Sequence, residues 1–151
     1  MAHFKRILVP VDFSGHADVA LDLAIELAKE GGAEIHLLHA YELPASVTMA
    51  YGVAIPQSVW DGVQEAAAKK LAESLARVKA AGVTGATHLL TAPAADAIVE
   101  TAIAQRADLI VMATRGLTGL KHVLLGSVAE RTIRIAPCPV LTVKGKADAK
   151  A

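Results

Sequence analysis

The chain has 151 residues, with 15 basic side chains, 15 acidic side chains and six histidines. This length favours a single domain with a core of its own. The balanced charge argues against a broad cationic surface for nucleic acid, and an aromatic content of 3% argues against base-stacking surfaces. The single cysteine, Cys138, excludes an internal disulfide framework and a cysteine zinc cluster.

The hydropathy pattern contains no candidate membrane segment. No apolar stretch approaches the length of a span, and the first apolar run, 7–11, is too short for the core of a signal peptide. We therefore expect a cytoplasmic protein with no membrane insertion and no nucleic-acid partner.

The first half of the chain alternates between strand and helix patterns. The run 7–11 predicts a strand buried on both faces. A helical period follows, with Ser14 as a favourable N-cap and a glycine pair at 31–32 as a stop. A second strand is predicted at 33–40, and the stretch 41–57 has no clean period and predicts a long loop.

The second half repeats the alternation. A helix is predicted at 58–81, where apolar residues recur at spacings of three and four, namely Trp60, Val63, Ala67, Leu71, Leu75 and Val78. A third strand at 85–92 precedes a helix that Pro93 opens and that reaches about Arg106. A fourth strand at 108–114, a glycine-containing loop, a helix at 128–135 and a last strand at 140–144 complete a domain spanning 1–145, before a polar tail at 146–151.

This order predicts an α/β fold: a single-domain, Rossmann-like sandwich with a five-stranded parallel sheet and helices on both faces. Ligands of such sheets bind past the carboxyl ends of the strands, where the strand order reverses. The loops after the first and fourth strands are therefore the candidate site. The last strand follows Pro139 and is expected at a sheet edge, where it could pair with a second copy unless the tail or a helix covers it.

The loop "ATRGLTGLKHVLLGS" at 113–127 admits two interpretations. Its glycines could serve only as turn residues, and Ser127 with Glu130 matches a capping box that needs no ligand. Alternatively, the helix N-terminus and the loop N–H groups could hold a phosphate, aided by the Ser127 hydroxyl and by Arg115 and Lys121. The loop matches neither the Walker A pattern nor the dinucleotide fingerprint.

Three segments resemble the universal stress protein family: "ILVPVDFS" at 7–14, "LLHA" at 37–40 and "DLIVMATRGLTGLKHVLLGSVAERTIRIAPCPVLTV" at 108–143. The resemblance implies a five-stranded parallel α/β fold that is often dimeric. One branch of the family binds nucleotide through G-x2-G-x9-G-[ST], and another lacks these glycines and does not bind ATP. Here the pattern falls on Ala113, Gly116, Gly126 and Ser127. Alanine in place of the first glycine should matter little if its φ is negative, and should strain the loop if its φ is positive.

The resemblance implies a regulatory protein of a stress response that switches with bound ATP, AMP or ADP. Mg²⁺ or Mn²⁺ would arrive with the nucleotide, because the sequence offers no protein cage for a divalent ion. Asp12 would bind the nucleoside, although it could instead help to cap the first helix. The expected site residues are Pro10, Val11, Asp12, Ala40, Met112, Ala113, Arg115, Gly116, Gly126, Ser127, Val128 and Ala129.

Two alternatives to the nucleotide switch stay open. One is a nucleotide-independent module that acts through a homodimer at strand 139–144 and through a protein partner that the sequence does not identify. The other is slow ATP hydrolysis or phosphotransfer, with self-phosphorylation on Ser127 or a loop threonine. No local pattern suggests a catalytic triad, so no catalytic residue is assigned.

The histidines do not predict a metal site. His36 and His39 are three positions apart on one strand, so their side chains should point to opposite faces of the sheet. His88 has no second ligand at a useful spacing along the chain. Cys138 lies between two prolines and is expected to be a structural or incidental thiol rather than a catalytic one.

Overall fold

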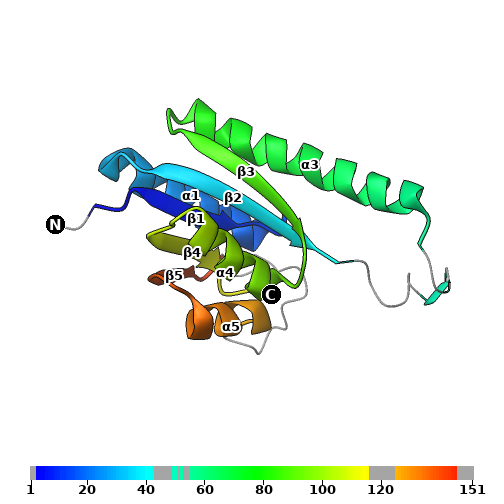
Figure 1. Cartoon of the computed structure of the whole chain (residues 1–151). Coiled ribbons are helices and arrows are strands. Elements are labelled where there is room, and N and C mark those ends of the chain that lie inside the picture. The colour runs from blue at the N-terminus through cyan, green and yellow to red at the C-terminus, as the bar shows by residue number, and fades with distance from the viewer. Residues whose placement is uncertain (1–2, 43–48, 51, 53–54, 116–124, 146–151) are drawn as a thin grey trace, which may run out of the picture.

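The computed structural model describes residues 3–42, 49–50, 52, 55–115 and 125–145. Five parallel strands form one sheet in the order β3-β2-β1-β4-β5 (Figure 1). Because the chain runs outward from β1 in both directions, the strand order reverses between β1 and β4. The predicted α/β sheet is confirmed, with β5 at an edge, and its strands are β1 (Arg6–Pro10), β2 (Glu34–Tyr41), β3 (Gly85–Thr91), β4 (Leu109–Ala113) and β5 (Val140–Val143).

Helices cover both faces of the sheet (Figure 1). On one side, which we name the α1/α3 face, lie α1 (Gly15–Gly31) and α3 (Gln57–Ala80). On the other, the α4/α5 face, lie α4 (Ala94–Ala104) and α5 (Ser127–Ile135). Within the described part of the chain, no helix combines the length and the apolar content that a membrane crossing needs.

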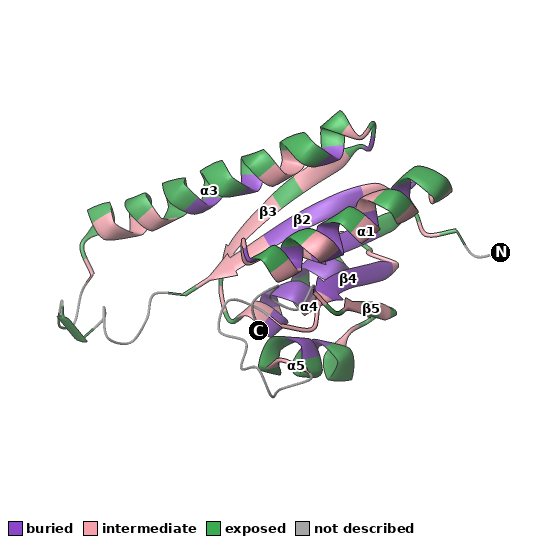
Figure 2. Cartoon of the chain, turned by 180° about the vertical axis from the view of Figure 1, so that it is seen from behind, coloured by how far each residue is buried: buried purple, intermediate pink, exposed green. Residues whose placement is uncertain are grey.

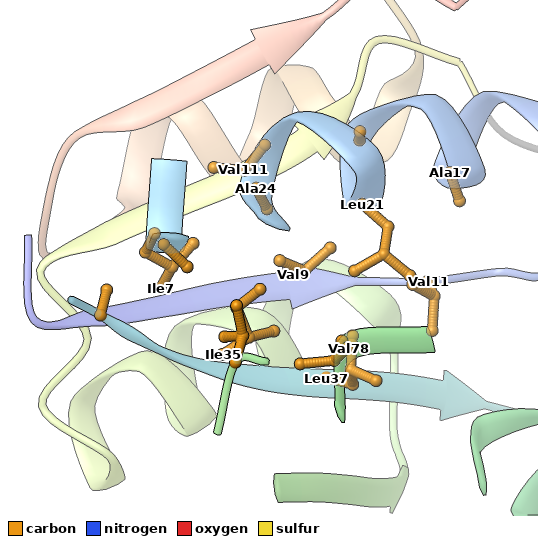
Figure 3. Close-up of a cluster of buried hydrophobic side chains, with 14 of the residues drawn as sticks. Ile7, Val9, Val11, Ala17, Leu21, Ala24, Ile35, Leu37, Val78 and Val111 are labelled. Carbon is orange, nitrogen blue, oxygen red and sulfur yellow. The ribbon is translucent and has the colours of Figure 1, made fainter. Parts of the chain in front are cut away.

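The core has two layers because successive strand residues point to opposite faces. In β1, Ile7 and Val9 pack toward the α1/α3 face and Leu8 packs toward the α4/α5 face, all fully buried. Figure 3 shows Val9 close to Leu21 of α1 in the first layer. Figure 2 shows buried residues concentrated in β2 and β4, with exposed residues on the outer sides of α3 and α5.

Local signals determine most helix ends. The Ser14 hydroxyl accepts the Ala17 N–H at 3.2 Å and caps α1, and Gly32 ends this helix with φ 69°, as predicted. α3 begins one residue before its predicted start, and of its apolar stripe only Ala67, Leu71 and Val78 are buried. The N-terminal turns of α3 extend past the carboxyl end of β2 (Figures 1 and 2), which explains why Trp60 remains half-buried. The predicted loop 41–57 lies partly, and the tail 146–151 wholly, outside the described residues.

Candidate functional site

The site is built from the chain segments that leave the carboxyl ends of the strands, which we call the carboxyl edge. At the end of β1, Pro10 is half-buried, and the Val11 N–H donates to the Leu38 carbonyl at 2.8 Å. The Val11 side chain is only 6% exposed and packs on the α1/α3 face. The Val11 side chain therefore belongs to the core, and its backbone joins the end of β1 to β2.

Asp12 follows at the point where the strand order reverses. Its Oδ1 accepts the Ser14 N–H at 3.0 Å, so the carboxylate orders the turn while Ser14 caps the helix. Between them, Phe13 has φ 65°, the left-handed region. That conformation costs a non-glycine residue on the order of 1 kcal/mol and persists only where the surroundings hold it.

The end of β2 places two different side chains beside this turn. Ala40 is half-buried against the α4/α5 core. His39 lies on the opposite face, where its Nδ1 donates to the Val11 carbonyl at 2.8 Å and its ring lies 4.4 Å from that of Phe13, centroid to centroid. No sequence motif places His39 in the site, although its position directly before Ala40 is a signal for such a role.

The end of β4 resolves the question about Ala113. Ala113 is the last residue of β4 and pairs with Val143. Among the described non-glycine residues, only Phe13 and Arg106 have a positive φ, so Ala113 has ordinary extended backbone and introduces no strain. Met112, before it, is 5% exposed and packs in the α4/α5 core.

The two described ends of the glycine loop are held together at a neck formed by Thr114 and Gly126. The Gly126 N–H donates to the Thr114 carbonyl at 2.6 Å, and a Cβ on Gly126 would lie 3.0 Å from that same oxygen. Gly126 has φ −70°, so the close approach favours glycine here, and a left-handed turn does not. Arg115 is half-buried beside the neck, whereas Gly116 and Lys121 lie outside the described residues.

The start of α5 corrects the capping-box prediction. The N-cap residue is Gly126, and Ser127 is already the first residue of the helix. The Glu130 carboxylate instead accepts from Arg134 at 2.8 Å, one turn further on. The predicted reciprocal cap is therefore wrong, because Ser127 lies one position too far into the helix. The first N–H groups of a helix have no partners within the helix and can donate to an anion.

These elements meet at one place. Ala40 packs against the same hydrophobic cluster that contains Met112 and Ala129, so the ends of β2 and β4 and the first turn of α5 share the core of the α4/α5 face. Ala129 is 2% exposed, so it could contact a ligand only through its N–H, whereas Ser127 and Val128 are exposed. Among the described residues, the arrangement includes the Asp12 carboxylate, the Ser127 hydroxyl and the backbone N–H groups at the start of α5.

A second polar cluster lies on the α4/α5 face and contains histidines. The imidazoles of His36 and His88 meet with Nδ1 and Nε2 2.9 Å apart, and His36 Nε2 lies 2.9 Å from Glu34 Oε1. Arg6 also contacts this carboxylate, at 3.0 Å. The sequence pattern offered His88 no second metal ligand at a useful spacing and did not reveal its contact with His36, which arises because the strand register sets His88 opposite Leu38, on the same face as His36. His39 lies on the other face, as predicted.

The two imidazoles share one proton along an N–H···N bond. Their ring centroids are 5.2 Å apart and the rings are tilted by only 21°, so they meet edge to edge. Burial, followed by the charge of His36, lowers the pKa of His88 below its ordinary 6.5. The hydrogen bond from His36 is the largest cause that lowers the pKa of Glu34. Over the described residues, no three histidine, cysteine or acidic side chains are grouped to hold a metal ion.

Comparison with known proteins agrees with this architecture. The model of the universal stress protein family matches residues 3–144. Universal stress protein MJ0531 of Methanocaldococcus jannaschii is 39% identical over 145 residues, which cover 93% of this chain and 82% of that protein.

Two solved structures extend the comparison. The hypothetical protein MJ0577 is 28% identical with a TM-score of 0.85, over 97% of this chain and 100% of that one. A universal stress protein solved in complex with cAMP is 27% identical with a TM-score of 0.68, over 96% and 100%. From the family match over nearly its whole length and from these relatives, the chain belongs to the universal stress protein family.

Proposed function

We propose that this chain binds an adenine nucleotide at the carboxyl edge between β1 and β4 and acts as a nucleotide-dependent switch in a cytoplasmic stress response. The observation that carries the proposal is the neck between Thr114 and Gly126. It favours glycine at a close approach of two backbones, and it leads directly into the N-terminus of α5 beside the end of β4. The family member solved with cAMP supports an adenine nucleotide as the ligand class.

Each side chain and backbone group then has a defined task. The Asp12 carboxylate accepts from the ribose hydroxyls, and the Ala40 backbone faces the base. The N–H groups at 127–129 and the Ser127 hydroxyl bind phosphate oxygens, which the positive end of the helix dipole favours. ATP would bring Mg²⁺ or Mn²⁺ with it, and AMP and ADP are the alternative ligands. The alanine at 113 is compatible with this role, because it lies in unstrained extended backbone.

Thermal unfolding of nucleotide-stripped protein, with and without saturating Mg-ATP, tests the proposal. A ligand at 100 times its Kd adds about 2.7 kcal/mol to the free energy of unfolding. For a domain of this size, Tm should then rise by about 5–10 °C. Asp12→Asn should reduce the rise, because it removes the charge but keeps an oxygen for the Ser14 N–H. Asp18→Asn, on the exposed side of α1, is the matched control. No rise at millimolar ATP would refute nucleotide binding.

The alternative of a dimeric interaction module also has one observation in its favour. β5 lies at the edge of the sheet, and Leu141 in its middle is 37% exposed. An apolar edge strand is a template for pairing with another chain. We therefore propose a homodimer through 139–144, which is compatible with either function. Light scattering coupled to size-exclusion chromatography would detect it, and a monomer at tens of micromolar would contradict it.

A further inference from the structure

The ladder of backbone hydrogen bonds between β1 and β2 ends where the His39 side chain bonds to the Val11 carbonyl. The register runs as far as Pro10 opposite Leu38, and the Val11 N–H then donates to the Leu38 carbonyl. In a continuing parallel ladder, the Val11 carbonyl would accept the Ala40 N–H. Among the backbone bonds of the described residues this rung is not formed, and the Val11 carbonyl accepts from His39 Nδ1 at 2.8 Å. Because a carbonyl can only accept, Nδ1 carries the proton.

The same imidazole supports the strained residue of the turn. The rings of Phe13 and His39 lie 4.4 Å apart with an interplanar angle of 37°. On α3, Lys70 places its Nζ 5.4 Å from the Phe13 centroid. Phe13 is the residue with φ 65°, and it stands between Asp12 and the Ser14 cap. His39 therefore contacts the turn at two points, the carbonyl before Asp12 and the ring after it.

We propose that His39 is a positioning residue of the nucleotide site, an inference that rests on the function proposed above. Its bond to Val11 ends the ladder, which leaves the Ala40 N–H for an acceptor on the base. Its contact with Phe13 holds the turn that presents the Asp12 carboxylate. His39 lies on the face away from Ala40, so it acts through these residues and does not touch the ligand.

Two substitutions separate the effect of the His39–Val11 hydrogen bond from the effect of the His39 ring packing on Phe13. His39→Phe keeps an aromatic ring against Phe13 and removes the donor to Val11. His39→Asn keeps an amide N–H near the position of Nδ1 and removes the ring. Tyr41→Leu is the control, because Tyr41 is the next ring along the same face, 6.3 Å from His39, and follows the segment that contacts Val11. All three should lower Tm through lost packing or bonding.

Comparison of two ligands shows whether a substitution at His39 weakens the binding of the nucleoside alone or also that of the phosphates. Inorganic tripolyphosphate needs only the glycine loop and α5, whereas AMP also needs Asp12 and Ala40. His39→Phe should weaken AMP binding about ten-fold, the scale of one lost hydrogen bond, and change tripolyphosphate binding less than about two-fold. His39→Asn should recover most of the AMP affinity, and Tyr41→Leu should retain it. Isothermal titration calorimetry measures each Kd.

Hydrogen exchange gives a readout that does not depend on ligand. The Ser14 amide is bonded to Asp12 Oδ1, so its exchange without nucleotide should accelerate in His39→Asn, which removes the ring against Phe13, and should stay slow in His39→Phe, which keeps it. Equal AMP affinity in wild type and His39→Phe, or equal losses for AMP and tripolyphosphate, would overturn the inference. If the wild type binds neither ligand, the proposed function fails and the nucleotide role of His39 with it. Ser14 exchange then still decides whether His39 fixes the turn.

Discussion

Acid should loosen the contact between β2 and the edge strand β3, because His36 and His88 share one proton across 2.9 Å. The unfolded chain protonates both imidazoles below a pH of about 6.5. If both imidazoles were protonated in the folded protein, the N–H groups at His36 Nδ1 and His88 Nε2 would face each other. Burial already lowers the pKa of His88 in the fold. The contribution of neutral His88 to the free energy of unfolding is therefore complete above pH 6.5, and it is lost as the pH falls through the lowered pKa of His88.

The size of the effect follows from counting protons. Where the unfolded chain binds one proton more than the fold, the free energy of unfolding falls by about 1.4 kcal/mol per pH unit. This fall in the free energy of unfolding has a limit, because His88 is half-buried and can turn its ring to water. It should stop at about 1 kcal/mol, the net value of one hydrogen bond. For a domain of this length, Tm would fall by about 2–4 °C.

Urea unfolding of wild type and His88→Gln at pH 8 and pH 5 isolates this pair from the other titrating groups. The glutamine amide keeps a donor near Nε2 and does not titrate. Both proteins should be about equally stable at pH 8, and the wild type should lose about 1 kcal/mol more on acidification. His3→Gln, at an exposed histidine, controls for removing an imidazole. Equal losses in wild type and His88→Gln would refute the shared proton as a source of acid sensitivity.

Three further substitutions test the Ser14 cap of α1, the neck between Thr114 and Gly126, and the edge strand β5. Ser14→Ala should cost about 1 kcal/mol in the free energy of unfolding, through loss of the bond to Ala17, and Ser58→Ala on exposed α3 should cost less; urea unfolding measures both. Gly126→Ala should weaken both tripolyphosphate and AMP in calorimetry, because its Cβ would press on the Thr114 carbonyl from 3.0 Å; unchanged affinities would contradict the neck. Leu141→Lys should shift the proposed homodimer to monomer in light scattering, because a charge at the edge opposes pairing.

Features encoded by neighbouring residues were predictable from the sequence. The serine cap at Ser14 and the left-handed stop at Gly32 each depend on a few adjacent positions, and both are confirmed. The alternation of strand and helix patterns implied the parallel sheet, and Pro139 placed β5 at its edge. The family resemblance, in turn, pointed to the residues at the carboxyl edge.

Features that depend on strand register were not predictable. His36 and His88 are 52 residues apart, and whether they meet depends on how α3 sets β3 against β2. The bond from His39 to the Val11 carbonyl likewise appears only once the ladder is known to end there. At the start of α5, the sequence suggested Ser127 as the cap, but the contact of Gly126 with the other end of the loop shifts the cap by one residue.

The two histidine arrangements should act independently, although both begin on β2. His36 points to the α4/α5 face and joins the edge strand β3, whereas His39 points to the α1/α3 face and joins the exit of β1. In the described part of the chain, the imidazole pair makes no hydrogen bond to Asp12, to Ala40 or to α5, so its protonation removes no direct contact of the candidate site. AMP affinity should therefore be the same in wild type and His88→Gln at both pH 8 and pH 5.5, while their stabilities diverge. A difference in affinity at pH 5.5 alone would mean that β2 transmits the protonation of the pair to the site.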